Sequence, residues 1–295
     1  MVRSMPFEAE RSLKGNTLRE RASPDAAAVV LRAFLERHVR VAVLSGAGLS
    51  TASGIPAYRD ESGAWRHSKP MTFAEFTGSE AARRRYWARS FAGWRRIAAA
   101  PPNPAHAALA RLEECGRVSG VITQNVDGLH QRAGSRRVID LHGRLDRVRC
   151  MGCGAVTPRA AFQARLDAAN DGWRAEAEAF APDGDATLAD ADVEHFRVPG
   201  CENCGGFLKP DVVFFGECVP AGRVAAAYAL LRGSDALLVV GSSLMVLSGF
   251  RFARAAREAG LPLAILNRGV TRADAIATQR VDGDCAELLA AAVAH

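Results

Sequence analysis

The fold is decided by the stretch VAVLSGAGLSTASGIPAYRD, which occupies residues 41–60. Its first four residues are apolar and partly β-branched, as is typical of a short buried strand. The strand leads into Gly46 and Gly48, and glycine lets a backbone turn sharply and come close to a ligand. Three hydroxyl residues suited to capping a short helix and facing an anion follow, namely Ser50, Thr51 and Ser53. This arrangement suits a diphosphate.

The glycine pair differs from the fingerprint of a hydride-transfer enzyme. That fingerprint, G-x-G-x-x-G, places a third glycine where Thr51 stands here. It also requires a second strand that ends in an acidic residue roughly 20 residues further on. No such strand follows. Taken alone, the loop is equally compatible with an ordinary turn between a strand and a helix.

The composition is that of a soluble globular protein, with 48% hydrophobic and 24% charged residues in 295. No apolar run approaches the length of a membrane span. Acidic residues alternate with arginines near the N-terminus, and an apolar signal core is absent. We therefore expect a cytoplasmic protein without a membrane partner. The net charge of +6 comes almost entirely from arginines in helical patterns, so we expect no nucleic-acid partner either.

The order of predicted elements indicates an α/β fold with a doubly wound, Rossmann-like parallel sheet. Residues 1–22 form an N-terminal arm. Residues 23–143 and 208–295 form the large domain, with a helical insertion at about 60–100 in which 72–100 is read as one helix. Residues 144–207 form a smaller inserted domain that carries cysteines. Strands are expected at 41–44, 118–123, 138–141, 236–240 and 261–266.

All five predicted strands end in polar or glycine-rich residues, which read GAG, QNVD, HG, GSS and NRG. The carboxyl ends of the strands in an open parallel sheet lie at one edge, where ligands bind. Each of these ends alone would be an ordinary loop. Five of them on one edge predict a nucleotide site.

The clearest metal signal is the pair of motifs Cys150-x-x-Cys153 and Cys201-x-x-Cys204. Two residues between thiolates let each pair hold one edge of a tetrahedral Zn²⁺. A site made of four thiolates has no open position, so we expect one structural zinc; the alternative is four unliganded thiols. The other three cysteines, Cys115, Cys218 and Cys285, are expected to be reduced thiols without a metal role.

His142 is the best candidate for a general base. It follows a predicted strand at the edge that carries the glycine loop, and imidazole titrates near neutral pH. His130 is the alternative, but it lies in the turn after QNVD, where a structural hydrogen bond is the simpler explanation. No comparable sequence context surrounds His67, His106 or His195.

The motifs together resemble the sirtuins, the NAD-consuming protein deacylases. They occur in family order from about Ala27 onward: GAGLSTASGIPAYR, TQNVDGLH, LHG, two CxxC pairs, KPDVVFFGE, GSS and LNRG. The long gap between the cysteine pairs and the wording PDVVFFGE resemble the class II branch. The alanine- and arginine-rich, lysine-poor composition favours a bacterial source. Ala57 departs from the resemblance, because the family has an acid at this position.

The resemblance implies a set of NAD-binding residues. Tyr58 lies near the nicotinamide ribose, Gln124, Asn125 and Asp127 hold the nicotinamide half, and the adenosine half lies near the backbone of Cys285. Asn125 joins His142 in the catalytic pair. The full set of residues expected to bind NAD is Gly46, Ala47, Gly48, Ser50, Ile55, Pro56, Tyr58, Arg59, Trp65, Gln124, Asn125, Asp127, Gly241, Ser242, Ser243, Asn267, Arg268, Gly269 and Cys285.

The resemblance also implies the protein substrate and the reaction. An acylated lysine binds between the domains, its backbone adding as a strand next to Val213, Phe214, Phe215 and Gly216 on one side and Val246 on the other. The acyl oxygen displaces nicotinamide from the ribose, and His142 then takes a proton from a ribose hydroxyl. The products are lysine and O-acyl-ADP-ribose.

Three alternatives remain open. A mono-ADP-ribosyltransferase would use the same NAD site, an oxidoreductase would form NADH, and a zinc-ribbon nucleic-acid module would bind in a salt-dependent way. The oligomeric state is left undetermined. The acyl group is addressed by one comparison: sirtuins that favour succinyl place a tyrosine and an arginine three residues apart, where this chain has Ala64 and His67. Acetyl or bulkier acyl groups are therefore expected to be preferred, unless Arg66 takes the arginine's role.

Overall fold

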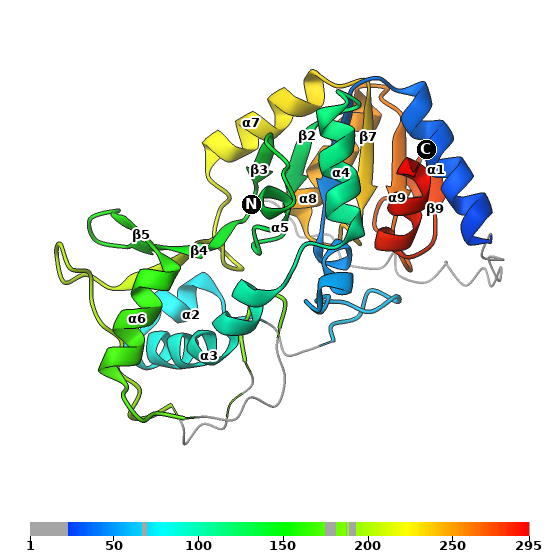
Figure 1. Ribbon diagram of the computed structural model, residues 1–295. Helices are drawn as coiled ribbons and strands as arrows, with labels where there is room; N and C mark the ends of the chain where they lie inside the picture. Colours follow the sequence, from blue (N-terminus) through cyan, green and yellow to red (C-terminus); the bar gives the residue numbers. More distant parts are fainter. Residues whose placement is uncertain (1–22, 67–69, 175–180, 187, 189–192, 295) are drawn as a thin grey trace, which may run out of the picture.

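The computed structural model describes residues 23–66, 70–174, 181–186, 188 and 193–294. The predicted N-terminal arm and His67 lie outside these residues. Two lobes are visible in Figure 1, a larger one built on a parallel sheet and a smaller one that contains α2, α3 and α6. Within the described residues, no helix is both long and apolar enough to cross a membrane.

The large lobe is a six-stranded parallel sheet in the order β3-β2-β1-β7-β8-β9. This is the doubly wound order, in which the chain builds outward from β1 in one direction and then from β7 in the other. The strands are β1 (Val41–Ser45), β2 (Val118–Thr123), β3 (Val138–Asp140), β7 (Ala236–Val240), β8 (Leu263–Leu266) and β9 (Gln279–Val281).

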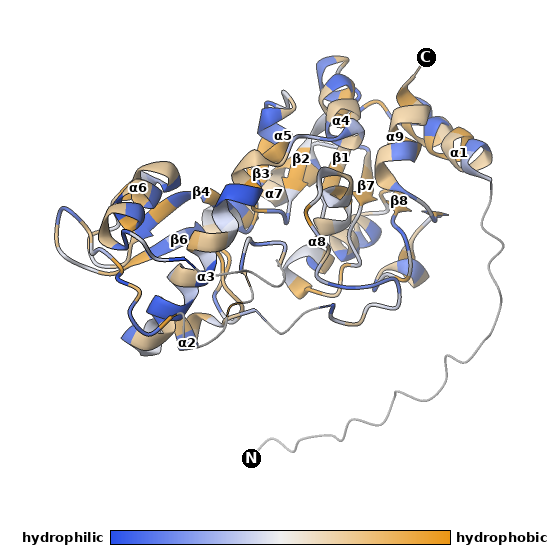
Figure 2. Cartoon of the chain, turned by 60° about the horizontal axis from the view of Figure 1, so that its bottom comes forward, coloured by the Kyte–Doolittle hydropathy of each residue, from blue (hydrophilic) through white to orange (hydrophobic). Residues whose placement is uncertain are grey.

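Alternate residues of each strand face the two helical layers. Val41 and Val43 of β1 pack in one core with α1 (Pro24–Arg37), α4 (Pro104–Glu114) and α9 (Cys285–Val293). Ala42 and Leu44 pack in a second core with α7 (Ala221–Arg232) and α8 (Leu247–Glu258). Because both faces are buried, the strands read as continuous apolar runs, and they are orange in Figure 2.

The small lobe has a core of its own. An antiparallel sheet of β5 (Val156–Pro158), β4 (Gly143–Cys150) and β6 (Leu208–Val212) packs with α6 (Arg159–Ala169), α2 (Phe73–Gly78) and α3 (Glu80–Ala99). Trp87 of α3 is fully buried in this core, and its indole N–H donates to the carbonyl of Leu208 at 3.0 Å. The helical insertion therefore packs with the cysteine-bearing segment, and the small lobe extends to residue 212.

The structure corrects three of the predicted elements. Residues 72–100 form two helices, because Ser79 is extended and its side chain caps α3 by accepting from Ala82 N. The sequence before Gly260 predicts a helix over residues 252–259, but helix α8 begins five residues earlier, at Leu247. Strand β9 was missed, since it is three residues long and two of them are polar.

The five predicted strands of the large lobe agree with the structure to within two residues at each end. Ser23 caps α1 and Asn103 caps α4, as the Ser-Pro and Asn-Pro sequences indicate. Asp284 caps α9 by accepting from Ala286 N and Glu287 N. A short helix, α5 (Leu129–Arg132), follows QNVD.

Candidate functional site

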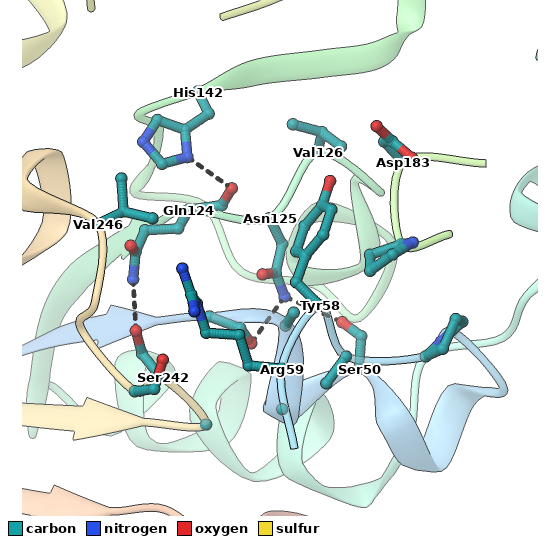
Figure 3. A pocket seen from close by; sticks show the side chains of 18 of the residues that line it. Ser50, Tyr58, Arg59, Gln124, Asn125, Val126, His142, Asp183, Ser242 and Val246 are labelled. Atoms are coloured by element: carbon teal, nitrogen blue, oxygen red, sulfur yellow. Dashed lines mark hydrogen bonds between the residues drawn. The ribbon is translucent and has the colours of Figure 1, made fainter. Parts of the chain in front are cut away.

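A cavity of about 990 Å³ opens between the two lobes, at the carboxyl ends of the central strands. β1 and β7 are neighbours in the sheet although their chains lead away in opposite directions. Open α/β sheets bind ligands at such a switch point. The cavity is lined by nearly all of the residues that the sequence nominates for NAD and for the acylated peptide. Figure 3 shows part of this lining.

Gly269 is the exception among the nominated residues, because it does not line the cavity. Its φ is +81°, and a Cβ at this position would lie 2.2 Å from the carbonyl oxygen of Glu61. Gly269 therefore supports the loop that carries Asn267 and Arg268, which do line the cavity. A direct contact between Gly269 and NAD stays a prediction.

The glycine loop is held against β7 by backbone packing. Gly46 N donates to Val240 O at 3.0 Å, and Gly48 N donates to Gly241 O at 2.8 Å. A Cβ on Gly46 or on Gly48 would lie 2.9 Å from Gly241 O. The prediction attributed these glycines to a sharp turn and to close approach of a ligand; neither has a positive φ, so the turn itself does not require glycine. They are required because two loops meet at the switch point with no room for side chains.

The hydroxyl residues after the loop have roles other than the predicted capping. Two single 3₁₀ turns follow, Ala47–Leu49 and Thr51–Ser53, and their N-caps make no side-chain hydrogen bond. Ser50 Oγ instead donates to Asp127 Oδ2 at 2.7 Å. The capping prediction is therefore wrong, and Ser50 connects the glycine loop to the QNVD segment.

The QNVD segment is fixed by hydrogen bonds to both neighbouring loops. Asn125 Nδ2 donates to Gly46 O at 3.1 Å and to Ser50 Oγ at 3.0 Å. Gln124 Nε2 donates to Ser242 Oγ at 2.8 Å. Burial raises the pKa of Asp127, while Leu129 N and Ser50 Oγ donate to its carboxylate. Gln124, Asn125 and Asp127 therefore lie in the cavity wall in fixed orientations.

His142 lies in the same wall, as predicted. Its Nδ1 is 3.0 Å from Gln124 O, and its Nε2 is 2.8 Å from Ser248 Oγ. Burial lowers the pKa of His142 to about 4, so the ring is neutral at pH 7. A neutral imidazole in a ligand cavity can accept a proton. The following residue, Gly143, has a φ of +85°, and a Cβ there would lie 2.0 Å from Asp211 O.

His130, the alternative base, is buried behind the cavity. Its Nε2 lies 2.8 Å from Ser45 Oγ, which donates to Thr123 Oγ1 at 2.9 Å. Thr123 Oγ1 in turn accepts from Asn125 N at 3.1 Å. The expected structural hydrogen bond is confirmed. His106 is also structural, because its Nδ1 accepts from Asn103 N at the start of α4.

The arginine side of the cavity is organised by aromatic contacts. The guanidinium of Arg59 lies 4.1 Å from the Trp65 ring centre, and Trp65 also contacts Tyr58 and Phe215. Arg59 Nη1 donates to Gly63 O at 2.7 Å, which closes this loop. Phe214 is buried and packs against Phe76, so its side chain lies mainly in the small-lobe core.

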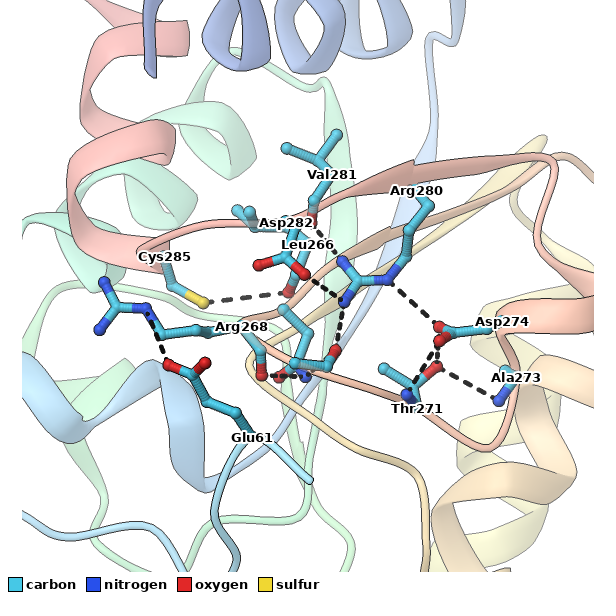
Figure 4. Close-up of polar contacts among 12 residues, drawn as sticks. Glu61, Leu266, Arg268, Thr271, Ala273, Asp274, Arg280, Val281, Asp282 and Cys285 are labelled. Carbon is cyan, nitrogen blue, oxygen red and sulfur yellow. Dashed lines mark hydrogen bonds and ion pairs between the residues drawn. The ribbon is translucent and has the colours of Figure 1, made fainter. Parts of the chain in front are cut away.

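Figure 4 shows the contacts around Arg268 and Cys285, which form another end of the cavity wall. Arg268 pairs with Glu61 at 3.9 Å and with Asp284 at 3.4 Å. Cys285 is the first residue of α9, and burial raises the pKa of its thiol to about 12. Behind this end, Arg280 pairs with Asp274 at 3.2 Å and with Asp282 at 3.5 Å.

Sequence reasoning missed several cavity residues, among them Ser248, Asp183 and Asp185. Asp183 and Asp185 reach the cavity on a loop of the small lobe that packs on α3, where Arg89 Nε donates to Ala186 O at 2.8 Å. Burial raises the pKa of both aspartates and of Tyr58, which hydrogen-bonds to Asp183. The sequence does not indicate that this loop lies beside Tyr58, because the two are more than a hundred residues apart along the chain.

The four cysteines of the two CxxC motifs form one cluster in the small lobe. Their sulfur atoms all lie within 4.8 Å of one another, with Cys150–Cys204 at 3.5 Å and Cys153–Cys201 at 3.7 Å. Zn–S bonds of about 2.3 Å in a tetrahedron place sulfurs about 3.8 Å apart. The N–H groups of Cys153 and Gly152 donate to Cys150 Sγ and lower the pKa of this thiol to about 6. The cluster fits a structural zinc site.

Comparison with known proteins identifies the family. The Sir2 family profile matches residues 46–248. The chain belongs to the Sir2 family. It is 58% identical over 260 residues to an "NAD-dependent protein deacetylase" of Xanthomonas axonopodis pv. citri, covering 88% of this chain and 89% of the relative. An "NAD-dependent protein deacetylase 2" of Bradyrhizobium diazoefficiens is also 58% identical over 260 residues, and the match covers 88% of this chain and 95% of that relative.

Solved structures of the family share the fold of this Sir2 chain. A structure titled "Sir2-p53 peptide-NAD+" superposes with a TM-score of 0.72 at 30% sequence identity, covering 88% of this chain and 94% of that one. Another, titled "Structural Basis for the Mechanism and Regulation of Sir2 Enzymes", has a TM-score of 0.70 at 33% identity and covers 92% and 96%. The predicted doubly wound fold is thus confirmed.

Proposed function

We propose that this Sir2 protein is an NAD-dependent protein-lysine deacylase that releases nicotinamide and forms O-acyl-ADP-ribose. The observation that carries the proposal is the neutral imidazole of His142 in a cavity whose wall also contains Asn125, at the switch point of the sheet. The names of the bacterial relatives support the same activity, because they are NAD-dependent protein deacetylases. The predicted bacterial cytoplasmic location and class II membership remain proposals.

In this proposal different segments of the chain bind NAD, bind the peptide and accept the proton. The glycine loop and the QNVD segment bind NAD, with Asn125 and Asp127 at the nicotinamide half. Asn267, Arg268 and the GSS loop bind the adenosine half. The acylated peptide adds between residues 213–216 and Val246. His142 accepts a proton from a ribose hydroxyl, and the four cysteines hold one zinc that stabilises the small lobe and takes no part in the reaction.

The experiment is incubation of the purified protein with NAD and an acyl-lysine peptide, followed by mass spectrometry. We expect stoichiometric nicotinamide, deacylated peptide and O-acyl-ADP-ribose. Transfer of label from NAD to protein would instead indicate a mono-ADP-ribosyltransferase. Growth of NADH absorbance would indicate an oxidoreductase and contradict the proposal.

We further propose that acetyl or bulkier acyl groups are preferred over succinyl. Ala64 provides no hydroxyl, and the carboxyl groups of Asp183 and Asp185 lie in the cavity wall. A buried acidic acyl group without a cationic partner costs several kcal/mol. Arg66 is the cation to consider, since it lines the cavity and its Nε donates to Arg59 O at 3.1 Å.

The acyl preference is measured as kcat/KM for acetyl, succinyl, branched C5–C6 and long-chain acyl groups on one peptide. A higher kcat/KM for succinyl than for acetyl would contradict the proposed preference, but it would still agree with NAD-dependent deacylation. If that succinyl activity were then lost in Arg66→Ala, the side chain of Arg66 would be identified as the recognising group.

A further inference from the structure

The hydroxyl of Ser248, at the start of α8, contacts the candidate base directly. Ser248 Oγ lies 2.8 Å from His142 Nε2, and both residues line the cavity. The other ring nitrogen, Nδ1, lies 3.0 Å from the carbonyl oxygen of Gln124, as Figure 3 shows. A carbonyl has no proton to give, so Nδ1 donates. In the neutral ring Nε2 then carries the lone pair, and Ser248 donates its hydroxyl proton to it.

The backbone around Ser248 is held close to the base. A Cβ at Gly249 would lie 2.3 Å from Gln124 Oε1, so the first turn of α8 packs directly against the side chain of Gln124. Phe252, one turn later, is fully buried in the core of the large lobe. The contact between Ser248 and His142 is therefore fixed by the packing of α8 on the residue that also accepts from Nδ1.

This contact leaves no free lone pair on the base. Neutral imidazole has one lone pair in the plane of its ring, and Ser248 occupies it. A serine hydroxyl donates one hydrogen bond and accepts two. It can therefore accept a hydrogen bond from an incoming hydroxyl while its own proton stays directed at Nε2. The side chains of Asn125, Gln124 and Ser242 hydrogen-bond the loops to one another, whereas the hydroxyl of Ser248 is directed at His142.

We propose that Ser248 is a catalytic residue that relays the proton from the ribose hydroxyl to His142. This inference rests on the proposed deacylase function. After the acyl oxygen has displaced nicotinamide, the ribose oxygen bonds to the acyl carbon, and the π pair between that carbon and the lysine nitrogen moves onto the nitrogen. The proton of the ribose hydroxyl passes to Ser248 Oγ. The original hydroxyl proton of Ser248 passes to His142 Nε2 in the same step. Ser248 ends as a neutral hydroxyl and His142 as an imidazolium, so protons and charge balance.

The first test compares Ser248→Ala, Ser248→Thr and a control, Ser119→Ala. Ser119 makes a hydroxyl contact with Ser234 at 2.6 Å, away from the cavity, so its truncation removes a comparable group. Acyl transfer to ribose is measured in single turnovers, and nicotinamide exchange is measured in parallel. Because a positioned proton carrier contributes about 10²- to 10⁴-fold, we expect Ser248→Ala to slow acyl transfer at least about tenfold.

The same variants should leave the earlier step intact. Nicotinamide exchange requires cleavage of the glycosidic bond and not the base, so we expect it to stay within about twofold of wild type in Ser248→Ala. Ser248→Thr keeps a hydroxyl and should retain acyl transfer. Equal losses of exchange and transfer would indicate a structural role and overturn the proposal. Undiminished transfer in Ser248→Ala would overturn it as well.

Two further measurements distinguish a relay from simple packing. In mixtures of H₂O and D₂O, a relay that moves two protons gives a curved dependence of the rate, whereas direct transfer to His142 gives a straight line. In the free protein, ¹⁵N NMR of His142 should show a protonated Nδ1 and a hydrogen-bonded Nε2, and the Nε2 signal should shift in Ser248→Ala. A linear dependence, or an unshifted Nε2 signal, would contradict the relay.

The proposal and the deacylase function can fail separately. If wild-type protein makes no O-acyl-ADP-ribose, the proposed function is wrong and the relay falls with it. If wild type makes the product and Ser248→Ala matches it, only the relay is wrong. The NMR measurement requires neither NAD nor peptide, so it tests the hydrogen bond between Ser248 and His142 independently of any activity.

Discussion

His142 combines the two properties that a base requires at neutral pH: it is unprotonated, and it lines the cavity. We expect His142→Ala to lower deacylation by about 10²-fold or more, because a general base contributes about 10²- to 10⁴-fold. Nicotinamide exchange should decline less, since it precedes the need for the base. Circular dichroism and NAD binding check that the fold is kept. Loss of turnover in a folded His130→Ala variant, with His142→Ala active, would reverse the assignment.

Three buried histidines predict instability in acid. Burial lowers the pKa values of His106, His130 and His142 to about 4, 3 and 4, from an ordinary value of 6.5. Below pH 6.5 the unfolded chain binds protons that the folded chain excludes. The free energy of unfolding should therefore fall as the pH falls from 6.5 towards 4, by about 1.4 kcal/mol per pH unit for each histidine.

Urea unfolding at a series of pH values measures this slope. His130→Gln removes one titrating group and should reduce the slope of unfolding free energy against pH by about 1.4 kcal/mol per pH unit, which corresponds to one proton. His195→Gln makes the same substitution at an exposed position and is the matched control. A slope that is unaltered in His130→Gln would show that the buried ring is not excluded from protonation.

At the scale of elements, the cysteine cluster ties β4 to the segment before β6. Structural zinc contributes on the order of 10 kcal/mol to the folding of small domains. We expect Cys150→Ser to lose the metal and to unfold the small lobe at a lower temperature. Cys218→Ser, an exposed cysteine outside the cluster, should keep both. Metal analysis and thermal melting check this, and zinc-free protein with unchanged melting and activity would contradict it.

The loop that carries Asp183 depends on a glycine in α3. A Cβ at Gly93 would lie 1.8 Å from the carbonyl oxygen of Gly184, so Gly93→Ala must push this loop away. Such overpacking costs about 1–3 kcal/mol. Gly78→Ala is the control, because among the described atoms none lies within 4 Å of a Cβ there. Melting temperatures and the KM for the acyl peptide measure both effects, and equal behaviour of the two variants would exclude this contact.

The sequence predicts the elements that depend on local pattern and misses those that depend on distant contacts. The parallel strands, the caps Ser23 and Asn103, and the two CxxC pairs follow from short-range rules. The glycines at 46 and 48 were singled out from a local pattern, but their crowding by Gly241 could not be predicted, because Gly241 is nearly two hundred residues away in the sequence. Ser248 offered no local pattern at all, because its role arises only when α8 packs beside His142.

At the scale of the whole molecule, the cavity is bounded by two separately packed lobes. The large lobe has a core on each face of its sheet, and the small lobe has a separate cluster to which Ile55 and Leu129 of the large lobe contribute. The cavity wall draws on both lobes, with Asn125 and His142 from one side and Phe214 and Asp183 from the other. Two such lobes can melt as independent cooperative units. Scanning calorimetry of the free protein should therefore resolve two endotherms, of which a zinc chelator lowers only one. A substrate that bridges the cavity makes each unit's stability conditional on the other, so saturating NAD and acyl peptide should merge the two endotherms into one.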